Sequence, residues 1–95
     1  MPALPQGRIT VPTHVVRRAF GTETVLLNLE SGQYHGLNAT GARMIDLLDE
    51  TGDAAKTAQS VADEADVPLE IVVGDLAEFC DQFVERGLIV IEDSD

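Results

Sequence analysis

The chain has 95 residues, with 17 acidic and 6 basic side chains, so its formal net charge is −11. This length suits one compact domain. The excess of acid argues against binding to nucleic acid or to an anionic membrane surface, because both need Lys and Arg side chains to contact phosphates. No apolar run approaches the roughly 20 residues that cross a bilayer, and no basic-then-apolar segment opens the chain, so we expect a soluble, cytoplasmic protein.

The few cysteine and histidine residues provide no evident centre for catalysis or metal binding. Cys80 is the single cysteine, and together with His14 and His35 it offers too few clustered ligands for zinc. Neither histidine has a cysteine or carboxylate at motif spacing, and Cys80 falls on an apolar helix face where burial keeps a thiol protonated. Because a glycine-rich phosphate loop is also missing, we expect no catalytic residue, metal or cofactor, and therefore a binding module.

The N-terminal part of the chain has the pattern of a small β-sheet. Its residues 1–8 contain two prolines and a glycine without periodicity, which predicts a flexible arm. Beyond the arm, β-branched and apolar runs alternate with turn-forming tripeptides. Three strands are expected, at 9–16, 24–29 and 33–37. Together they predict a three-stranded antiparallel meander.

The rest of the sequence predicts three helices and a short ending. Asn38 and Asp53 are good N-cap residues, Pro68 suits the first position of a third helix, and Gly87 ends that helix. The helices are expected at 39–49, 54–65 and 68–86. An apolar run at 88–91 predicts a fourth strand or an extended segment, followed by an acidic tail at 92–95. This order is that of an α+β, winged-helix-like domain spanning residues 9–91.

The third predicted helix has one wide apolar face and one acidic face. The apolar face consists of Leu69, Val72, Val73, Leu76, Phe79, Cys80, Phe83 and Val84. Ile71 is the one large apolar residue on the acidic side, so it could line a groove or contact a partner enzyme. An acidic exposed face is the reverse of what a DNA-recognition helix needs.

Several short motifs, in order and spacing, resemble those of the PqqD family of peptide-recognition domains. The motifs are Val25-Leu26-Leu27-Asn28, Ser31-Gly32-Gln33-Tyr34-His35-Gly36-Leu37-Asn38, Thr40-Gly41-Ala42, Asp75-Leu76 with Phe79, and Arg86-Gly87-Leu88-Ile89. Such domains serve pathways that make ribosomally synthesised, post-translationally modified peptides. The resemblance covers about residues 15–91. The form that the motif takes at residues 37–42, Leu-Asn-x-Thr-Gly-Ala, on an acidic chain of this size, is most similar to the B1 proteins of lasso-peptide clusters.

The resemblance implies that the chain is a non-catalytic adaptor for a precursor peptide. In the family, the leader region of the precursor adds as an antiparallel strand to the third strand of the meander, beside the third helix. The adaptor then presents the leader to a separate processing enzyme, here a B2-type leader peptidase or another modifying enzyme. The residues implied in leader binding are Gln33, Tyr34, His35, Gly36 and Leu37 on the strand, and Val72, Asp75, Leu76 and Phe79 on the helix.

Other interpretations remain open from the sequence. The chain could be a chaperone for a radical SAM enzyme in another pathway of this kind, or a winged-helix transcription regulator. Val72, Leu76 and Phe79 could belong to the core, and the Tyr34 ring could cover the core instead of contacting a leader. An exposed third strand also allows two states, a monomer or a dimer that pairs through this strand.

Overall fold

The computed structural model describes residues 4–92, and residues 1–3 of the arm and 93–95 of the tail lie outside the described part. The elements follow one another as β1 (Arg8–Thr10), β2 (Val15–Phe20), β3 (Glu23–Asn28), β4 (Tyr34–Leu37), α1 (Ala39–Thr51), α2 (Ala54–Ala65), α3 (Leu69–Glu85) and β5 (Val90–Glu92). The predicted α+β class, with a meander, three helices and a short C-terminal strand, is confirmed.

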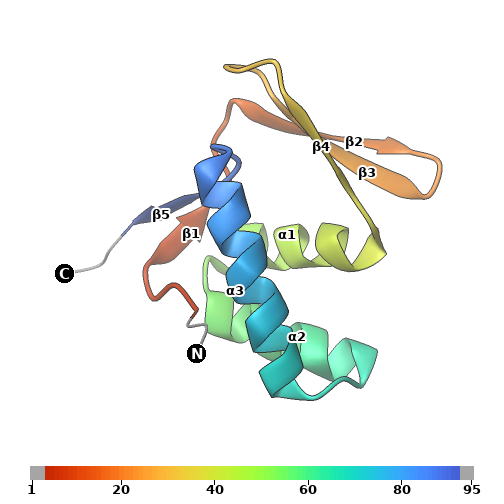
Figure 1. The fold of residues 1–95 in the computed structure, drawn as a ribbon, viewed down its shortest axis with the longest axis vertical. Helices are drawn as coiled ribbons and strands as arrows, with labels where there is room; N and C mark the ends of the chain where they lie inside the picture. Colours follow the sequence, from red (N-terminus) through yellow and green to blue (C-terminus); the bar gives the residue numbers. More distant parts are fainter. Residues whose placement is uncertain (1–3, 93–95) are drawn as a thin grey trace.

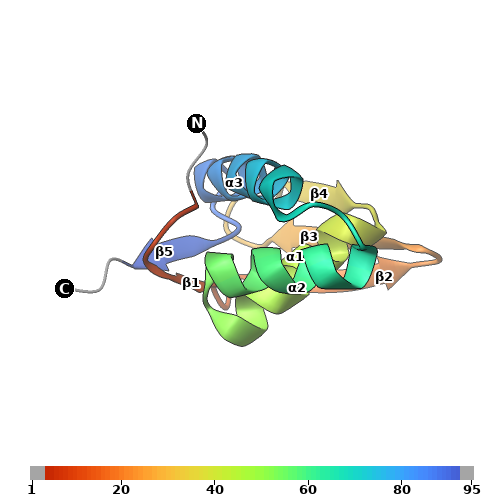
Figure 2. The same cartoon turned by 90° about the horizontal axis from the view of Figure 1, so that it is seen from below.

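The meander forms a sheet of its own, in the order β2-β3-β4, with every pair antiparallel. β3 lies in the centre, where Leu26 is opposite Arg17 on β2 and His35 on β4. The tip of the β2–β3 hairpin extends away from the β1–β5 pair, and α1 begins directly where β4 ends (Figures 1 and 2). Both β2 and β4 are edge strands of this sheet.

The first predicted strand, 9–16, is in fact two strands that belong to different sheets. β1 pairs with β5, so that Ile9 lies opposite Ile91, whereas β2 starts only at Val15. The break lies at Pro12, whose carbonyl accepts a hydrogen bond from the Val15 N–H at 3.0 Å in a tight turn. Ile9 is fully buried, so β1 also closes one side of the core.

The predicted arm and tail are shorter in the structure than in the sequence-based prediction. Arg8 belongs to β1, Gly7 is buried, and Leu4 packs against the core. Glu92, expected in the acidic tail, is the last residue of β5. The backbone pairing of β1 with β5 orders both ends, because the main-chain groups of each strand become partners for the other.

Local signals set the helix boundaries as predicted. The Asn38 side chain accepts a hydrogen bond from the Gly41 N–H at 2.8 Å, and Asp53 accepts one from Lys56 at 3.0 Å. At the end of α3 the Leu88 N–H donates to the Phe83 carbonyl at 2.8 Å, with Gly87 at φ +70°, which is a Schellman ending. Two details differ, since α1 continues to Thr51 and Pro68 precedes α3 as its cap.

The core is aliphatic, as the shortage of aromatic residues requires. Its large, fully buried apolar side chains come from β1, β3, α1, α3 and the segment after α3: Ile9, Leu26, Ile45, Leu48, Leu76, Phe83 and Ile89. Cys80 is buried among them, as the apolar face of α3 predicts. Within residues 4–92, every helix is too short or too polar to cross a membrane.

Candidate functional site

The outer edge of β4 is open to solvent in the described part of the chain. β4 pairs with β3 on one side, and no described strand lies on the other. The Asn28 N–H donates to the Gln33 carbonyl at 2.9 Å, which makes these two residues a hydrogen-bonded pair. Since such pairs alternate along an antiparallel ladder, His35 bonds to β3 through its main chain. Tyr34 and Gly36 therefore direct their N–H and C=O groups outward, where another strand can bind.

The side chains of β4 alternate between a covered and an open face. Leu37 is buried, and the His35 ring lies edge-to-face on Phe83, with ring centroids 5.0 Å apart. Tyr34 points to the opposite side and is 74% exposed, so it does not cover the core. A Cβ at Gly36 would meet nothing within 4 Å. The open face of the strand is therefore uncrowded at Gly36.

Phe79 brings α3 close to the far end of β4. Its ring stacks on Phe83 at 4.0 Å, and it is partly exposed. A Cβ at Gly41 would lie 3.2 Å from the Leu37 side chain and 3.5 Å from the Phe79 ring, so the end of β4, the start of α1 and Phe79 meet there. Leu37 and Phe79, two expected site residues, are therefore neighbours.

Two of the expected site residues on α3 lie in the core, the alternative that the sequence left open for them. Val72 is 4% exposed and Leu76 is 0% exposed, and both belong to the buried cluster. Both side chains therefore pack in the core and are not exposed beside β4. Asp75 is exposed, and Ile71, which is 53% exposed, lies one turn before it on the same side of the helix.

Two shallow hollows lie where β4 begins and α3 ends. The first is lined by Asn28, Gln33, Tyr34, His35, Arg86 and Leu88, and the second by Gln33, Gln82, Glu85 and Arg86. Helical spacing places Asp75, Phe79, Gln82 and Arg86 along one side of α3. We call the combination of β4 with these four residues the β4–α3 surface.

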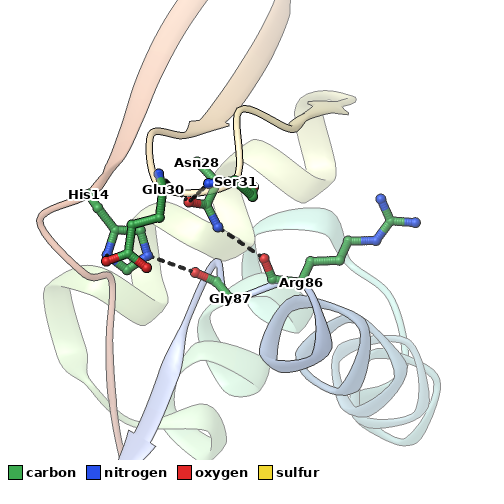
Figure 3. Close-up of polar contacts among 6 residues, drawn as sticks. All are labelled: His14, Asn28, Glu30, Ser31, Arg86 and Gly87. Atoms are coloured by element: carbon green, nitrogen blue, oxygen red, sulfur yellow. Dashed lines mark hydrogen bonds and ion pairs between the residues drawn. The ribbon is translucent and has the colours of Figure 1, made fainter.

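A buried asparagine holds the start of β4 against the end of α3 (Figure 3). Asn28 accepts hydrogen bonds from the Glu30 N–H at 2.9 Å and the Ser31 N–H at 3.3 Å, and it donates to the Arg86 carbonyl at 3.2 Å. His14 adds a contact from its Nε2 to the Gly87 carbonyl at 3.3 Å. The loop before β4 is therefore fixed to the C-terminus of α3.

Residues 23–89 match the family model described as coenzyme PQQ synthesis protein D (PqqD). The chain belongs to the PqqD family. No curated protein matches it.

Two solved structures resemble this PqqD-family protein. The structure of TbiB1 in complex with the TbiA(beta) leader peptide matches with a TM-score of 0.80 and 28% identity, over 90% of this chain and 99% of TbiB1. A lasso peptide synthetase B1 complexed with the leader peptide matches with a TM-score of 0.79 over 87% of this chain and 98% of that one. At 24% identity the second structure supports the fold alone.

The titratable groups around the PqqD-family site have distinct environments. Partial burial lowers the pKa of His35, and the positive charge of Arg86 lowers it further. Burial raises the pKa of the Cys80 thiol to about 11, helped by the nearby Asp81 carboxylate. This thiol is therefore protonated at neutral pH, as expected of a structural cysteine. Among the described residues, no three His, Cys, Asp or Glu side chains gather as metal ligands.

Three residues that shape this region were not predicted as site residues: Asn28, Gln82 and Arg86. Asn28 and Arg86 were part of the motifs behind the family resemblance, but no local pattern indicated that they touch each other. Gln82 lies outside the predicted apolar face of its helix and outside these motifs. Gln82 follows Asp75 by two helical turns, and this spacing was the available signal that both residues lie on the same side of α3.

Proposed function

We propose that this protein binds the leader region of a ribosomally made precursor peptide as an added strand on β4, and presents it to a separate processing enzyme. The observation that carries the proposal is the open edge of β4, where Tyr34 and Gly36 direct main-chain groups outward. The match to TbiB1, whose structure contains a leader peptide, supports the binding of a leader peptide by this fold. The resemblance of residues 37–42 to the B1 proteins of lasso-peptide clusters favours a lasso-peptide pathway, in which a B2-type leader peptidase is the processing enzyme.

Main-chain pairing alone does not give useful affinity. Two residues with outward groups make about four hydrogen bonds, worth about 4 kcal/mol in total, whereas micromolar binding requires about 8 kcal/mol. Side chains on the β4–α3 surface must supply the difference. Phe79 is the best-placed apolar anchor, because its ring is partly exposed beside the end of β4. Tyr34 offers a second aromatic surface on the open face of the strand.

The proposed role is that of an adaptor without chemistry of its own. Cys80, the only thiol, is buried and protonated, and His35 packs on Phe83 with no nucleophile beside it among its described contacts. The exposed side of α3 carries Asp75 and Glu78, so it is a poor match for a DNA backbone. Bond cleavage in the leader is therefore assigned to the processing enzyme.

A proline at the open edge tests the proposal. Gly36→Pro removes an outward N–H and obstructs an incoming strand, while the β3–β4 hydrogen bonds of His35 remain. Ala19→Pro is the matched control, because Ala19 lies on β2, at the opposite edge of the sheet. The Leu29 N–H donates to the His14 carbonyl, and the alternation of hydrogen-bonded pairs from there directs the Ala19 N–H outward. The probe is a fluorescent peptide selected on the wild-type protein from a phage-displayed library of random peptides.

We expect Gly36→Pro to weaken binding of the selected peptide by about tenfold or more, as loss of a hydrogen bond and steric obstruction together require. Ala19→Pro should keep the wild-type affinity, and circular dichroism should show both variants folded. The proposal fails if the library yields no peptide with saturable binding, or if the proline on β2 weakens binding as much as the proline on β4.

A further inference from the structure

Arg86 is an arginine without an ionic partner in the described part of the chain, at one end of the β4–α3 surface. Two other arginines are neutralised within the fold, since Arg17 pairs with Asp46 and Arg43 forms two hydrogen bonds to Glu64 at 2.8 and 2.7 Å. Arg8 and Arg18 have no ion pair among the described residues either, but only Arg86 lies on the β4–α3 surface. Arg86 is exposed and forms no ion pair within residues 4–92. In Figure 3 its side chain extends away from the cluster around Asn28.

The surroundings of Arg86 combine its guanidinium with hydrogen-bonding amide side chains. Both hollows at the start of β4 are lined by Arg86 and Gln33, and one also includes Gln82 and the acidic Glu85. The charge of Arg86 reaches the strand, because it helps to lower the pKa of His35. A guanidinium with amide donors beside it suits a carboxylate, which it can bind through two parallel hydrogen bonds.

We infer that Arg86 is a specificity-determining residue that binds an acidic side chain of the leader. The inference rests on the proposed function, since it requires a peptide strand at the edge of β4. The side chain of Arg86 is free for this role because the fold uses the main chain of this residue instead. Its carbonyl accepts the hydrogen bond from Asn28, and that contact persists whatever side chain stands at position 86.

The direction of β4 predicts where the acidic residue lies in the leader. β4 begins beside Arg86 and ends beside Phe79, as the hollow at Tyr34 and the contacts around Gly41 show. An antiparallel partner therefore passes Phe79 first and Arg86 later. Seven helical residues separate the two side chains, which is about 10 Å or about three residues of strand. We expect an apolar anchor followed about three residues later by Asp or Glu.

A selection experiment tests this inference. Phage-displayed random peptides are selected in parallel on the wild-type protein, on Arg86→Glu and on Arg18→Glu. Arg18 is the matched control, because it is an exposed arginine on β2, away from the β4–α3 surface, and has the same change of charge. A peptide enriched on the wild type is then resynthesised with its acidic residue changed to the corresponding amide.

We expect wild-type and Arg18→Glu selections to enrich Asp or Glu at one position after an apolar residue, and Arg86→Glu to lose this preference or favour Lys and Arg. The amide peptide should bind the wild type about tenfold more weakly, and it should lose nothing on Arg86→Glu. Circular dichroism checks that each variant is folded.

The outcomes separate this inference from the proposed function. If no enriched peptide depends on the edge of β4, as judged by its loss on Gly36→Pro, the proposed function fails. If enriched peptides depend on that edge but carry no preferred acidic position, or if Arg86→Glu selects the same sequences as the wild type, the function stands and the role of Arg86 is wrong.

Discussion

Asn28 is the residue on which the geometry of the site depends most. Its buried amide joins the loop before β4 to the end of α3 through three hydrogen bonds. Asn28→Ala leaves the Arg86 carbonyl and the loop N–H groups without this partner, and we expect the free energy of unfolding to fall by about 2 kcal/mol. Urea denaturation measures the change. Gln59→Ala is the control, since its exposed amide bonds only to Asp63 and should cost less than about 0.5 kcal/mol.

His35 gives the fold a predictable response to pH. Burial and then the charge of Arg86 lower its pKa below the ordinary 6.5, so the folded protein prefers the neutral ring. The unfolded chain therefore gains a proton at a higher pH than the folded protein does. Stability should be fully present above about pH 6.5 and decline as the pH falls from there through the folded-state pKa.

Urea unfolding between pH 7.5 and pH 5 checks this linkage. The decline in unfolding free energy should be smaller in His35→Gln, whereas His14→Gln should retain it. If the wild type and His35→Gln lose stability in parallel over this range, His35 is not the group responsible.

At the scale of elements, the sequence predicted what local signals determine. The caps at Asn38 and Asp53 and the ending at Gly87 act within one helical turn, and each lies where it was expected. β1 was predicted as part of the meander because its pairing with β5 joins residues about 80 positions apart, which no local pattern reveals.

The same holds for the candidate site: nearby residues predicted its elements, whereas contacts between residues distant in the sequence determine which groups are exposed. The residue pattern predicted the strand at 33–37, and the family resemblance implied that a leader binds there. Only the register with β3 shows that Tyr34 and Gly36, rather than His35, present their main chain at the open edge. Val72 and Phe79 belong to the same apolar face of the helix, and their different burial depends on the neighbours that cover each one. Helical periodicity alone does not specify those neighbours.

Gly7 tests how much the β1–β5 pair contributes. A Cβ at this position would overlap the Glu92 backbone and lie 2.9 Å from the Ile91 side chain, so Gly7→Ala forces β5 to move. We expect a loss of about 1 to 3 kcal/mol, seen as a lower midpoint of thermal unfolding. Gly36→Ala is the control for stability, because its Cβ meets open space. Equal midpoints for the two variants would mean that the termini are not held as the structure shows.

At the scale of the whole molecule, the net charge of −11 acts differently from the local charge of Arg86. A large negative field attracts basic segments of a leader or processing enzyme at long range and raises the rate of encounter. Short-range contacts at the β4–α3 surface then determine how long the complex lasts. Stopped-flow measurements should therefore show that added salt slows association more than it speeds dissociation. If the association rate does not change with salt concentration, the acidic surface does not attract the partner, and its role is limited to solubility.

The central claim is that the open edge of β4 receives a peptide strand, and amide hydrogen exchange followed by NMR tests it most directly. In the protein without peptide, the Tyr34 and Gly36 amides should exchange rapidly, because their N–H groups face solvent. Saturation with a selected peptide should protect both, while the Arg17 and Ala19 amides at the edge of β2 remain unchanged. A bound peptide that leaves Tyr34 and Gly36 unprotected, or that protects the β2 edge instead, would contradict strand addition at β4.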